Sequence, residues 1–377
     1  MADPTLSIPP HLLPADGRFG SGPSRVRDAQ MQALSRAGHT LMGTSHRQAP
    51  VKKLVQRIQE GLAELFSLPD GYEVVLGNGG ATALWDVATF SLVDSRAQHL
   101  VFGEFSGSFA KATAAAPFLR DPSVIQAPPG SLAAPEADDD VDVFAWPHNE
   151  TSTGVMAPVQ RVPGQMPDQL VLVDATSGAG GLDVDVSATD LYYFAPQKSF
   201  ASDGGLWIAL TSPAAIDRAQ RIAASGRYIP GFLNFSTALE NSRKHQTLNT
   251  PAIATLILMA EQVEWMNEQG GLSWAAGRSR ETSGLLHDWV RSRADLEFFV
   301  ADEAARSRVV TTIDVDESID AALVASTLRA HGIVDVEPYR KLGRNQLRIA
   351  TFPAVEAADV RALIASTNAV LDQLAAR

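Results

Sequence analysis

The chain has 377 residues, 45% of them hydrophobic and 20% charged, which is the composition of a globular protein, and its length favours two domains. The net charge of -12 argues against nucleic acid as a partner, and the absence of cysteine excludes disulfides, thiolate metal sites and cysteine nucleophiles. No stretch is apolar enough to span a membrane and the N-terminus lacks signal-peptide features, so we expect a cytoplasmic protein that binds neither a membrane nor a metal.

The N-terminal part is predicted to be an arm followed by helices. Residues 1–17 are rich in proline and show no hydrophobic period, so we interpret them as an arm that is either mobile or packed on the surface. A turn at Gly20–Ser24 leads into a helix. Apolar residues at helical spacing then predict a second helix from Pro50 to about Phe66.

Short apolar segments, separated by helical or Gly-rich stretches, continue from there to residue 210. They are typical of the buried strands of a mixed or mainly parallel sheet, so the fold class is predicted to be α/β. The predicted strands are Glu73–Leu76, His99–Phe102, Val141–Ala145, Leu170–Asp174, Leu191–Phe194 and Leu206–Leu210.

The C-terminal part has a different pattern, which is typical of a smaller α+β domain. Helical segments run from Pro251 to about Arg293. They are followed by a predicted strand at Arg308–Ile313, a helix at Ile319–His331, a strand at Gln346–Ala350 and a helix at Val355–Leu374. We place the domain boundary at Gly270-Gly271, which gives a large domain of residues 18–270 and a small domain of residues 271–377.

Lys198 and Asp174 are the first candidates for chemistry. Lys198 lies between two apolar strands, where a lysine considered alone is more often an exposed loop residue. Asp174 ends the strand Leu170–Asp174, and open α/β sheets bind ligands at such strand ends. A buried carboxylate there needs a cationic partner, either an arginine or a protonated heterocycle. The pair suits pyridoxal phosphate, whose aldehyde carbon is held by a lysine and whose ring nitrogen is kept protonated by an acid.

Several other segments fit the same cofactor. Leu76–Trp85 predicts a strand, a Gly-rich turn and a helix start, whose amides suit a phosphate, although such turns are also common without a ligand. The segment has neither the Walker lysine nor the dinucleotide fingerprint, which favours a cofactor monophosphate. Phe105 either stacks on a ring or belongs to the core. The polar run Asn149–Gly154 also follows a predicted strand.

Two cationic clusters suggest an anionic substrate, although each alone is equally consistent with a solvated surface. Arginine matches carboxylates and phosphates with two parallel hydrogen bonds. The clusters are Thr44-Ser45-His46-Arg47 and the segment Tyr339–Arg348, which contains Arg340, Lys341, Arg344 and Arg348.

With these motifs, the chain resembles the phosphoserine aminotransferase family, within the fold-type I, class V group of pyridoxal-phosphate enzymes. The resemblance extends from about Phe19 to the C-terminus. It rests on Phe-Gly-Ser21-Gly-Pro, Ser-His46-Arg47, Val-Asp174-Ala-Thr-Ser, Ala-Pro-Gln197-Lys198-Ser and Leu248-Asn249-Thr250-Pro251. It implies a large domain around a central seven-stranded, mainly parallel sheet, with a smaller C-terminal domain. It also implies a homodimer with shared active sites.

The resemblance further implies a reaction and roles for residues. The amino group of glutamate would pass to 3-phosphohydroxypyruvate in serine biosynthesis, and also to the phosphohydroxythreonine analogue of pyridoxine biosynthesis. Lys198 would hold the cofactor covalently and act in catalysis with Asp174, which pairs with the ring nitrogen. Other cofactor contacts would come from Ala81, Thr82, Phe105, Thr151 and Gln197, and from Asn249 and Thr250 of the other subunit. The substrate carboxylate or phosphate would meet Ser21, His46, Arg47, Arg340 and Arg348.

The sequence departs from the family pattern in three respects. Relatives commonly have Gly-Gly-Gly-Arg where this chain has Gly-Gly-Ala81-Thr82, and a His-Arg pair where it has Tyr339-Arg340. The spacing between Arg340 and Arg348 is also two residues longer than the resemblance implies. Which residues of the segment Tyr339–Arg348 contact the phosphate therefore stays open. The alternative is a serine- or alanine-glyoxylate aminotransferase of the same fold, which needs no phosphate pocket. A cysteine desulfurase would need a thiol that the chain lacks, and a cofactor-binding protein without turnover would not need the proton-transfer residues.

Overall fold

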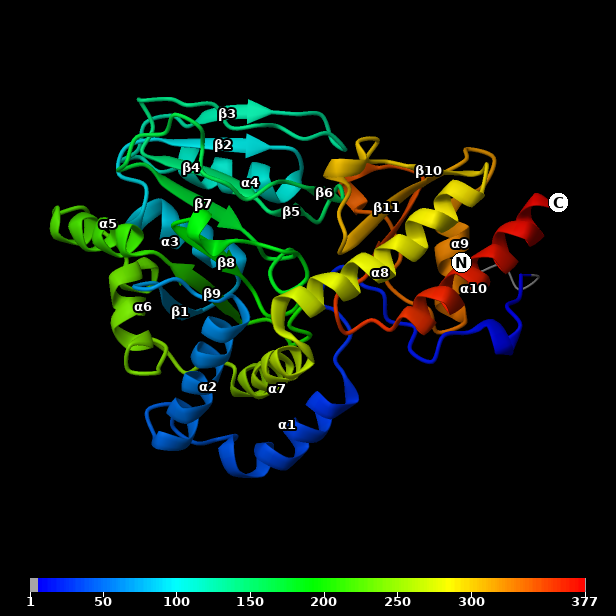
Figure 1. Ribbon diagram of the computed structural model, residues 1–377, viewed down its shortest axis with the longest axis horizontal. Coiled ribbons are helices and arrows are strands. Elements are labelled where there is room, and N and C mark those ends of the chain that lie inside the picture. Colours follow the sequence, from blue (N-terminus) through cyan, green and yellow to red (C-terminus); the bar gives the residue numbers. More distant parts are fainter. Residues whose placement is uncertain (1–5, 377) are drawn as a thin grey trace.

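A central mixed sheet forms the larger part of the computed structural model, which describes residues 6–376 (Figure 1). Its seven strands follow the order β1-β9-β8-β7-β4-β2-β3. Their bounds are β1 (Glu73–Asn78), β2 (Ala97–Val101), β3 (Ser123–Gln126), β4 (Val143–Pro147), β7 (Leu170–Asp174), β8 (Leu191–Phe194) and β9 (Leu206–Thr211). β9 is antiparallel to both neighbours and the remaining pairs are parallel. The predicted α/β fold with a seven-stranded, mainly parallel sheet is confirmed.

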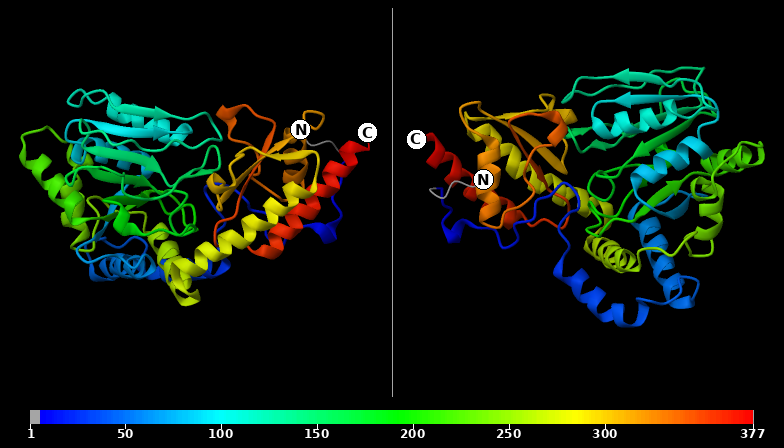
Figure 2. Two further views of the ribbon diagram at one scale, coloured as in Figure 1. Left: turned by 45° about the horizontal axis from the view of Figure 1, so that its top comes forward. Right: turned by 180° about the vertical axis from the view of Figure 1, so that it is seen from behind.

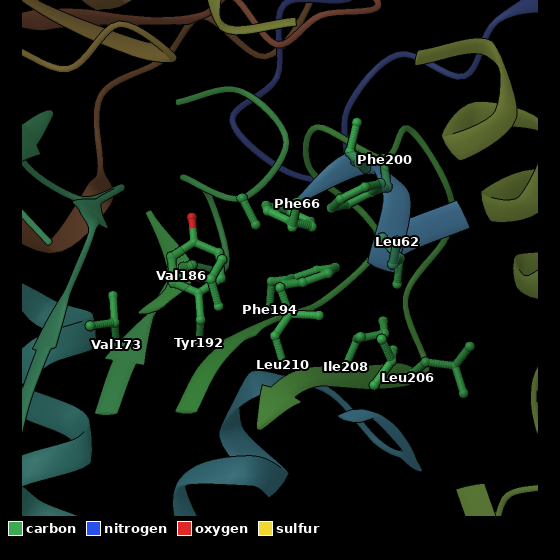
Figure 3. Close-up of a cluster of buried hydrophobic side chains, with 14 of the residues drawn as sticks. Leu62, Phe66, Val173, Val186, Tyr192, Phe194, Phe200, Leu206, Ile208 and Leu210 are labelled. Carbon is green, nitrogen blue, oxygen red and sulfur yellow. The ribbon is translucent and has the colours of Figure 1, made fainter. Parts of the chain in front are cut away.

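Helices cover both faces of this sheet, because its strands are apolar on both sides. Along β8, Leu191 and Tyr193 pack into a cluster with α3, α5 and α6, whereas Tyr192 and Phe194 pack into a cluster with α2 and α7. Figure 3 shows Tyr192 and Phe194 beside Phe66 at the end of α2. The helix bounds are α1 (Asp28–Leu41), α2 (Ala49–Leu65), α3 (Ala81–Ser91), α4 (Glu104–Ala114), α5 (Pro213–Ala224), α6 (Phe235–Ser242) and α7 (Ile253–Gln269).

A smaller group of elements follows, built on a three-stranded antiparallel sheet with its own apolar cluster. Its elements are α8 (Gly271–Ser292), β10 (Leu296–Phe298), β11 (Val310–Val315), α9 (Ala321–Ala330), β12 (Gln346–Ala350) and α10 (Ala357–Ala375). Figure 2 shows α8 and α10 side by side, joined by residues such as Trp289, whose Nε1 donates to Asn368 Oδ1 at 2.8 Å. A β5–β6 hairpin (Asn149–Glu150 and Val155–Met156) completes the strands. The 3-10 helices are η1 (Pro10–Leu12), η2 (Val186–Ala188), η3 (Gly231–Leu233), η4 (Glu303–Ala305) and η5 (Arg340–Leu342).

The helix α8 belongs to both groups. Gly270 (φ 124°) and Gly271 (φ 71°) turn the chain between α7 and α8, in a backbone region that other residues rarely adopt. The first turns of α8 pack in the large cluster through Ala275, whereas its later residues Leu286 and Trp289 pack in the small one. The boundary at residue 270 stays a prediction, because α8 is shared between the two cores.

The N-terminal arm packs on the small sheet's cluster, as far as the structure describes it. Residues 1–5 lie outside the described part. Leu6 and Ile8 are buried in the small cluster, and the Ser7 amide donates to Gln373 Oε1 at 3.1 Å. Among the helices of residues 6–376, none is long and apolar enough to cross a membrane.

The short strands β3, β5, β6 and β10 were missed by sequence reasoning. β3 has four residues at the sheet edge, and Val124 within it is 47% exposed. An edge strand has one neighbour and a weak apolar pattern, so periodicity alone does not identify it.

Ile8 provides a test of the arm's contribution to stability. Because its side chain is buried in the small cluster, Ile8→Ala is expected to lower the free energy of unfolding by about 2–4 kcal/mol. His11→Ala, at an exposed position of the same arm, is the control and should change it by less than about 0.5 kcal/mol. Thermal unfolding followed by circular dichroism measures both, and equal stability of the two variants would contradict packing of the arm.

Candidate active site

Five strands of the central sheet point their carboxyl ends at one cavity of about 200 Å³. Since parallel strands end at the same edge, the segments that follow β1, β2, β4, β7 and β8 meet there. The cavity is lined by Gly80, Ala81, Thr82, Trp85, Phe105, Pro147, Asn149, Thr151, Asp174, Thr176, Gln197 and Lys198. Seven of the residues predicted for the cofactor are in this set: Ala81, Thr82, Phe105, Thr151, Asp174, Gln197 and Lys198.

Lys198 is buried in the cavity wall beneath the N-terminal segment. Its Nζ donates to the Ser21 carbonyl, and a Cβ added to Gly22 would lie 2.1 Å from that nitrogen. Only glycine therefore fits at position 22. Burial, followed by the positive charge of Arg348, lowers the Lys198 pKa from 10.5 to about 8, although Asp174 acts in the opposite direction. A lysine of this pKa is a ready nucleophile and base near neutral pH.

Asp174 is partly buried at the end of β7, where it lines the cavity, and it forms no ion pair with any residue in 6–376. Its carboxylate accepts hydrogen bonds from Trp85 Nε1 at 2.8 Å and from the Thr176 amide at 2.9 Å. Burial raises the Asp174 pKa, and these donors oppose that shift. A buried carboxylate with neutral donors only is suited to receive a cation from a ligand.

The start of α3 offers backbone amides to the same cavity. Gly80 is the N-cap residue, and the first intrahelical bond of the helix is made by the Leu84 amide to the Gly80 carbonyl. The amides of Ala81 and Thr82 precede that bond and are free to bind an anion at the positive end of the helix dipole.

Phe105 is positioned by a buried carboxylate, Glu150. Glu150 accepts from the Phe105 and Ser106 amides at 3.4 and 2.9 Å, and thus caps the start of α4. A Cβ on Gly103 would lie 2.3 Å from Glu150, so the approach of the two segments requires glycine. Burial raises the Glu150 pKa.

Arg348, on β12 of the small sheet, lies beside the cavity but does not line it. Its Nη1 donates to the Thr151 carbonyl at 3.1 Å, and its Nε is buried with no acceptor among residues 6–376. Thr151 in turn donates to Ser177 Oγ at 2.7 Å. Arg348 also influences the Lys198 pKa, so the two cations share one electrostatic environment. Ser21 Oγ, above Lys198, is likewise buried without a partner in the described residues.

The residues His46, Arg47, Asn249 and Thr250 lie together, but none of them lines the cavity of its own chain. His46 Nδ1 is 3.3 Å from Thr250 Oγ1, and Arg47 Nη1 donates to Gln246 Oε1 at 3.0 Å. Burial and the charge of Arg47 lower the His46 pKa. The Asn78 side chain donates to the Asn249 carbonyl at 3.3 Å, which connects this group to the loop before α3.

Most of the cationic segment Arg340–Arg348 is engaged elsewhere. Arg340 is exposed, does not line the cavity, and forms no ion pair within the described residues. Lys341 pairs with Glu104, and Arg344 pairs with Asp314 at 2.7 Å. Of the four cations in this segment, the structure brings Arg348 to the site.

Sequence reasoning missed Trp85, Pro147 and Thr176 as lining residues, and Tyr339 as a neighbour of Phe105 and Arg348. One signal was available for Trp85: it follows Ala81 by four residues, so both lie on one face of α3. Tyr339 carried no such signal. Phe105 is more than 200 residues away in sequence, and Arg348 lies on β12, beyond the turn that follows Tyr339.

A larger cavity of about 750 Å³ lies elsewhere, lined by residues such as His148, Met156, Leu182 and Arg308. Its acidic side chains are already engaged: Asp183 with Arg280, and Asp185 and Asp302 with backbone amides. The smaller cavity therefore holds the reactive groups, and size does not identify the site here.

The residues of the smaller cavity fit pyridoxal phosphate. A buried amine, a buried carboxylate without an ion pair, and free amides at a helix start correspond to its aldehyde, ring nitrogen and phosphate. Gln197 Oε1 is also buried with no donor among residues 6–376, beside Lys198. The cavity thus has an unused polar partner where a ligand would be held.

Comparison with known proteins gives the same answer. Residues 131–336 match the family model described as Aminotransferase class-V. A phosphoserine aminotransferase from Nocardioides sp. (strain ATCC BAA-499 / JS614) is 63% identical over 370 residues, covering 98% of this chain and 99% of that one. The crystal structure of a phosphoserine aminotransferase from Cytophaga hutchinsonii ATCC 33406 has a TM-score of 0.88 at 23% identity, covering 94% and 99%. A PLP-bound phosphoserine aminotransferase from Trichomonas vaginalis gives 0.80 at 16% identity, covering 94% and 99%.

The fold and the site define a class V aminotransferase of PLP fold-type I. With nearly two thirds of its residues identical to a full-length relative, the chain belongs, within that class, to the phosphoserine aminotransferase family.

The Lys198 amine provides a test of the site's electrostatics. In cofactor-free protein it is expected to titrate near pH 8, because burial and Arg348 disfavour its charged form. Arg348→Leu removes a positive neighbour and should raise the pKa toward 10.5, whereas Asp174→Asn removes a negative one and should lower it further. The pH dependence of Lys198 labelling by fluorodinitrobenzene, followed by mass spectrometry, measures these pKa values. A Lys198 pKa that shifts in the opposite direction in either variant would contradict the positions of Arg348 and Asp174 near this amine.

Proposed function

We propose that this protein is a pyridoxal-phosphate-dependent phosphoserine aminotransferase. It transfers the amino group between glutamate and 3-phosphohydroxypyruvate, giving O-phosphoserine and 2-oxoglutarate for serine biosynthesis. One observation carries the assignment most directly: Lys198 and Asp174 line the same cavity, and Asp174 forms no ion pair within the described residues. The identity of 63% to a phosphoserine aminotransferase supports the choice of substrate.

The chain's own residues divide the work of holding the cofactor. Lys198 holds its aldehyde carbon, Asp174 its ring nitrogen, and the Ala81 and Thr82 amides its phosphate. Phe105 lies against the ring, and Thr151 and Gln197 contact its polar edge. When bound, the pyridine ring withdraws electrons from the bond between the substrate's α-carbon and hydrogen.

Lys198 is the proposed proton carrier of the reaction. Its pKa of about 8 leaves part of the amine neutral near pH 7.5, so Nζ is able to take a proton from the substrate's α-carbon and return it. Asp174 would stay ionised with the ring nitrogen protonated, because that cation would compensate for the burial that raises the Asp174 pKa. The Ser21–Gly22 segment covers Lys198 and keeps water from it.

The substrate's anionic groups require cations around this cavity. Arg348 is proposed to receive a carboxylate of the substrate, together with Ser21. The buried Arg348 Nε donor and the buried Ser21 Oγ, both without a partner in the described residues, support this role. His46, Arg47 and Arg340 are proposed for the carboxylate or phosphate. Because His46 and Arg47 do not line their own chain's cavity, we place them, with Asn249 and Thr250, at the cavity of a second copy. The protein is thus proposed to be a homodimer with shared active sites.

Lys198→Ala provides the direct test of cofactor attachment. The variant should lose the visible absorbance of the lysine-bound cofactor and at least about 1000-fold of the activity, since no other cavity residue carries an amine. Lys111→Ala, at an exposed position on α4, is the control and should keep both. The assay follows 2-oxoglutarate formed from glutamate and 3-phosphohydroxypyruvate.

Activity with pyruvate or glyoxylate, but none with the phosphorylated keto acid, would favour the alanine-glyoxylate alternative. Activity on the phosphohydroxythreonine analogue tests the role in pyridoxine biosynthesis.

Mixed dimers test whether the active sites are shared. In a dimer of one Lys198→Ala and one Arg47→Ala chain, one site has both defects and the other has none. Mixing the two inactive variants should therefore restore about a quarter of wild-type activity after subunit exchange. The mass of the protein from light scattering serves as the companion measurement. No recovery of activity, with exchange demonstrated, would show that Arg47 acts within its own chain.

A further inference from the structure

Tyr339 occupies the junction between the small sheet and the active-site cavity. Its ring centroid lies 5.8 Å from that of Phe105, with the two planes at 61°. The guanidinium carbon of Arg348 lies 5.3 Å from the same centroid. One aromatic ring thus contacts both a residue that lines the cavity and the arginine beside it.

Few other groups hold Arg348 in place. It forms no ion pair within residues 6–376, and the one hydrogen bond of its side chain there is to the Thr151 carbonyl, at 3.1 Å. Because an arginine side chain has four rotatable bonds, one hydrogen bond alone does not fix the orientation of its guanidinium. The π-face of Tyr339 is the remaining contact that favours one orientation of the guanidinium.

The backbone on either side of Tyr339 is held in place by contacts with other elements. Lys341, two residues later, pairs with Glu104 on α4, next to Phe105. On the other side, the Arg348 amide donates to the Val336 carbonyl at 2.9 Å. The Tyr339 side chain makes no hydrogen bond to the described residues, so the ring, and not the hydroxyl, makes these contacts.

We propose that Tyr339 is a positioning residue that holds the guanidinium of Arg348, with its unused donors, toward the substrate carboxylate. The inference rests on the proposed function, because it assumes that Arg348 receives a carboxylate. The inference gives a role in substrate binding to Tyr339, the residue before Arg340. The segment Tyr339–Arg348 would then contribute to binding although Arg340 is exposed and Lys341 and Arg344 are paired with acidic residues. Loss of the ring would weaken binding without removing any charge.

The experiment compares variants that keep or remove the ring. Tyr339→Phe keeps it and should bind succinate, a dicarboxylate without a reacting group, within about 2-fold of wild type. Tyr339→Leu removes it and should raise the dissociation constant about 10-fold, which corresponds to about 1.4 kcal/mol. Calorimetry on the cofactor-loaded protein measures this binding. The KM for glutamate should rise in parallel, with kcat within about 3-fold and an unchanged cofactor spectrum. If Tyr339→Leu does not fold, it is replaced by Tyr339→Met, because methionine also lacks a ring and is similar in volume to leucine.

Phe298→Leu is the matched control. It removes a ring lying 3.8 Å from the Arg306 guanidinium carbon in the same small sheet, but not at the cavity, and should leave succinate binding unchanged. Unchanged binding in Tyr339→Leu, or equal weakening in Tyr339→Phe, would overturn the role of the ring. If the wild-type protein did not bind succinate, the carboxylate role of Arg348 and this inference would fall together. Succinate binding without turnover of glutamate would count against the proposed function alone.

Discussion

Asp174 and Lys198 are buried around one cavity, yet they do not form an ion pair with each other. An uncompensated carboxylate in a low-dielectric site is costly, and so is a buried ammonium. Neutral donors from Trp85 and the Thr176 amide stabilise Asp174 only in part. Lys198 responds to its burial with a lowered pKa. Asp174 and Lys198 therefore suit the cavity to a ligand that carries both a cationic ring and an electrophilic carbon.

The rest of the fold holds these two groups at a fixed separation. Asp174 ends β7 and Lys198 follows β8, and the two strands are paired in parallel, with Asp174 opposite Tyr193. Apolar side chains on both faces of β8 fix the strand between two layers of helices. The sheet therefore places the chemistry at its carboxyl edge and leaves the loops free to differ in sequence.

The small sheet determines how the cavity is closed on its open side. The arm, α8 and β12 form one core there, so Arg348 is held on a packed strand, and Tyr339 contacts it from the segment that leads into η5. α8 enters both cores and couples their positions. This arrangement brings Arg348, which is 150 residues after Lys198 in sequence, close enough to lower the Lys198 pKa.

The sequence by itself determined the strands that carry the site, and β7, β8 and β12 were predicted with their observed bounds. It also indicated Lys198, Asp174 and the start of α3, because strand ends and Gly-rich turns leave local signals. Only the tertiary structure decided which cation of Arg340–Arg348 lies beside the cavity, where Arg348 donates to the Thr151 carbonyl, and that Trp85 contacts Asp174. It also brought Tyr339 against Phe105 and Arg348. The physical reason is that such contacts depend on how two separate cores pack against each other, and hydrophobic periodicity describes each element alone.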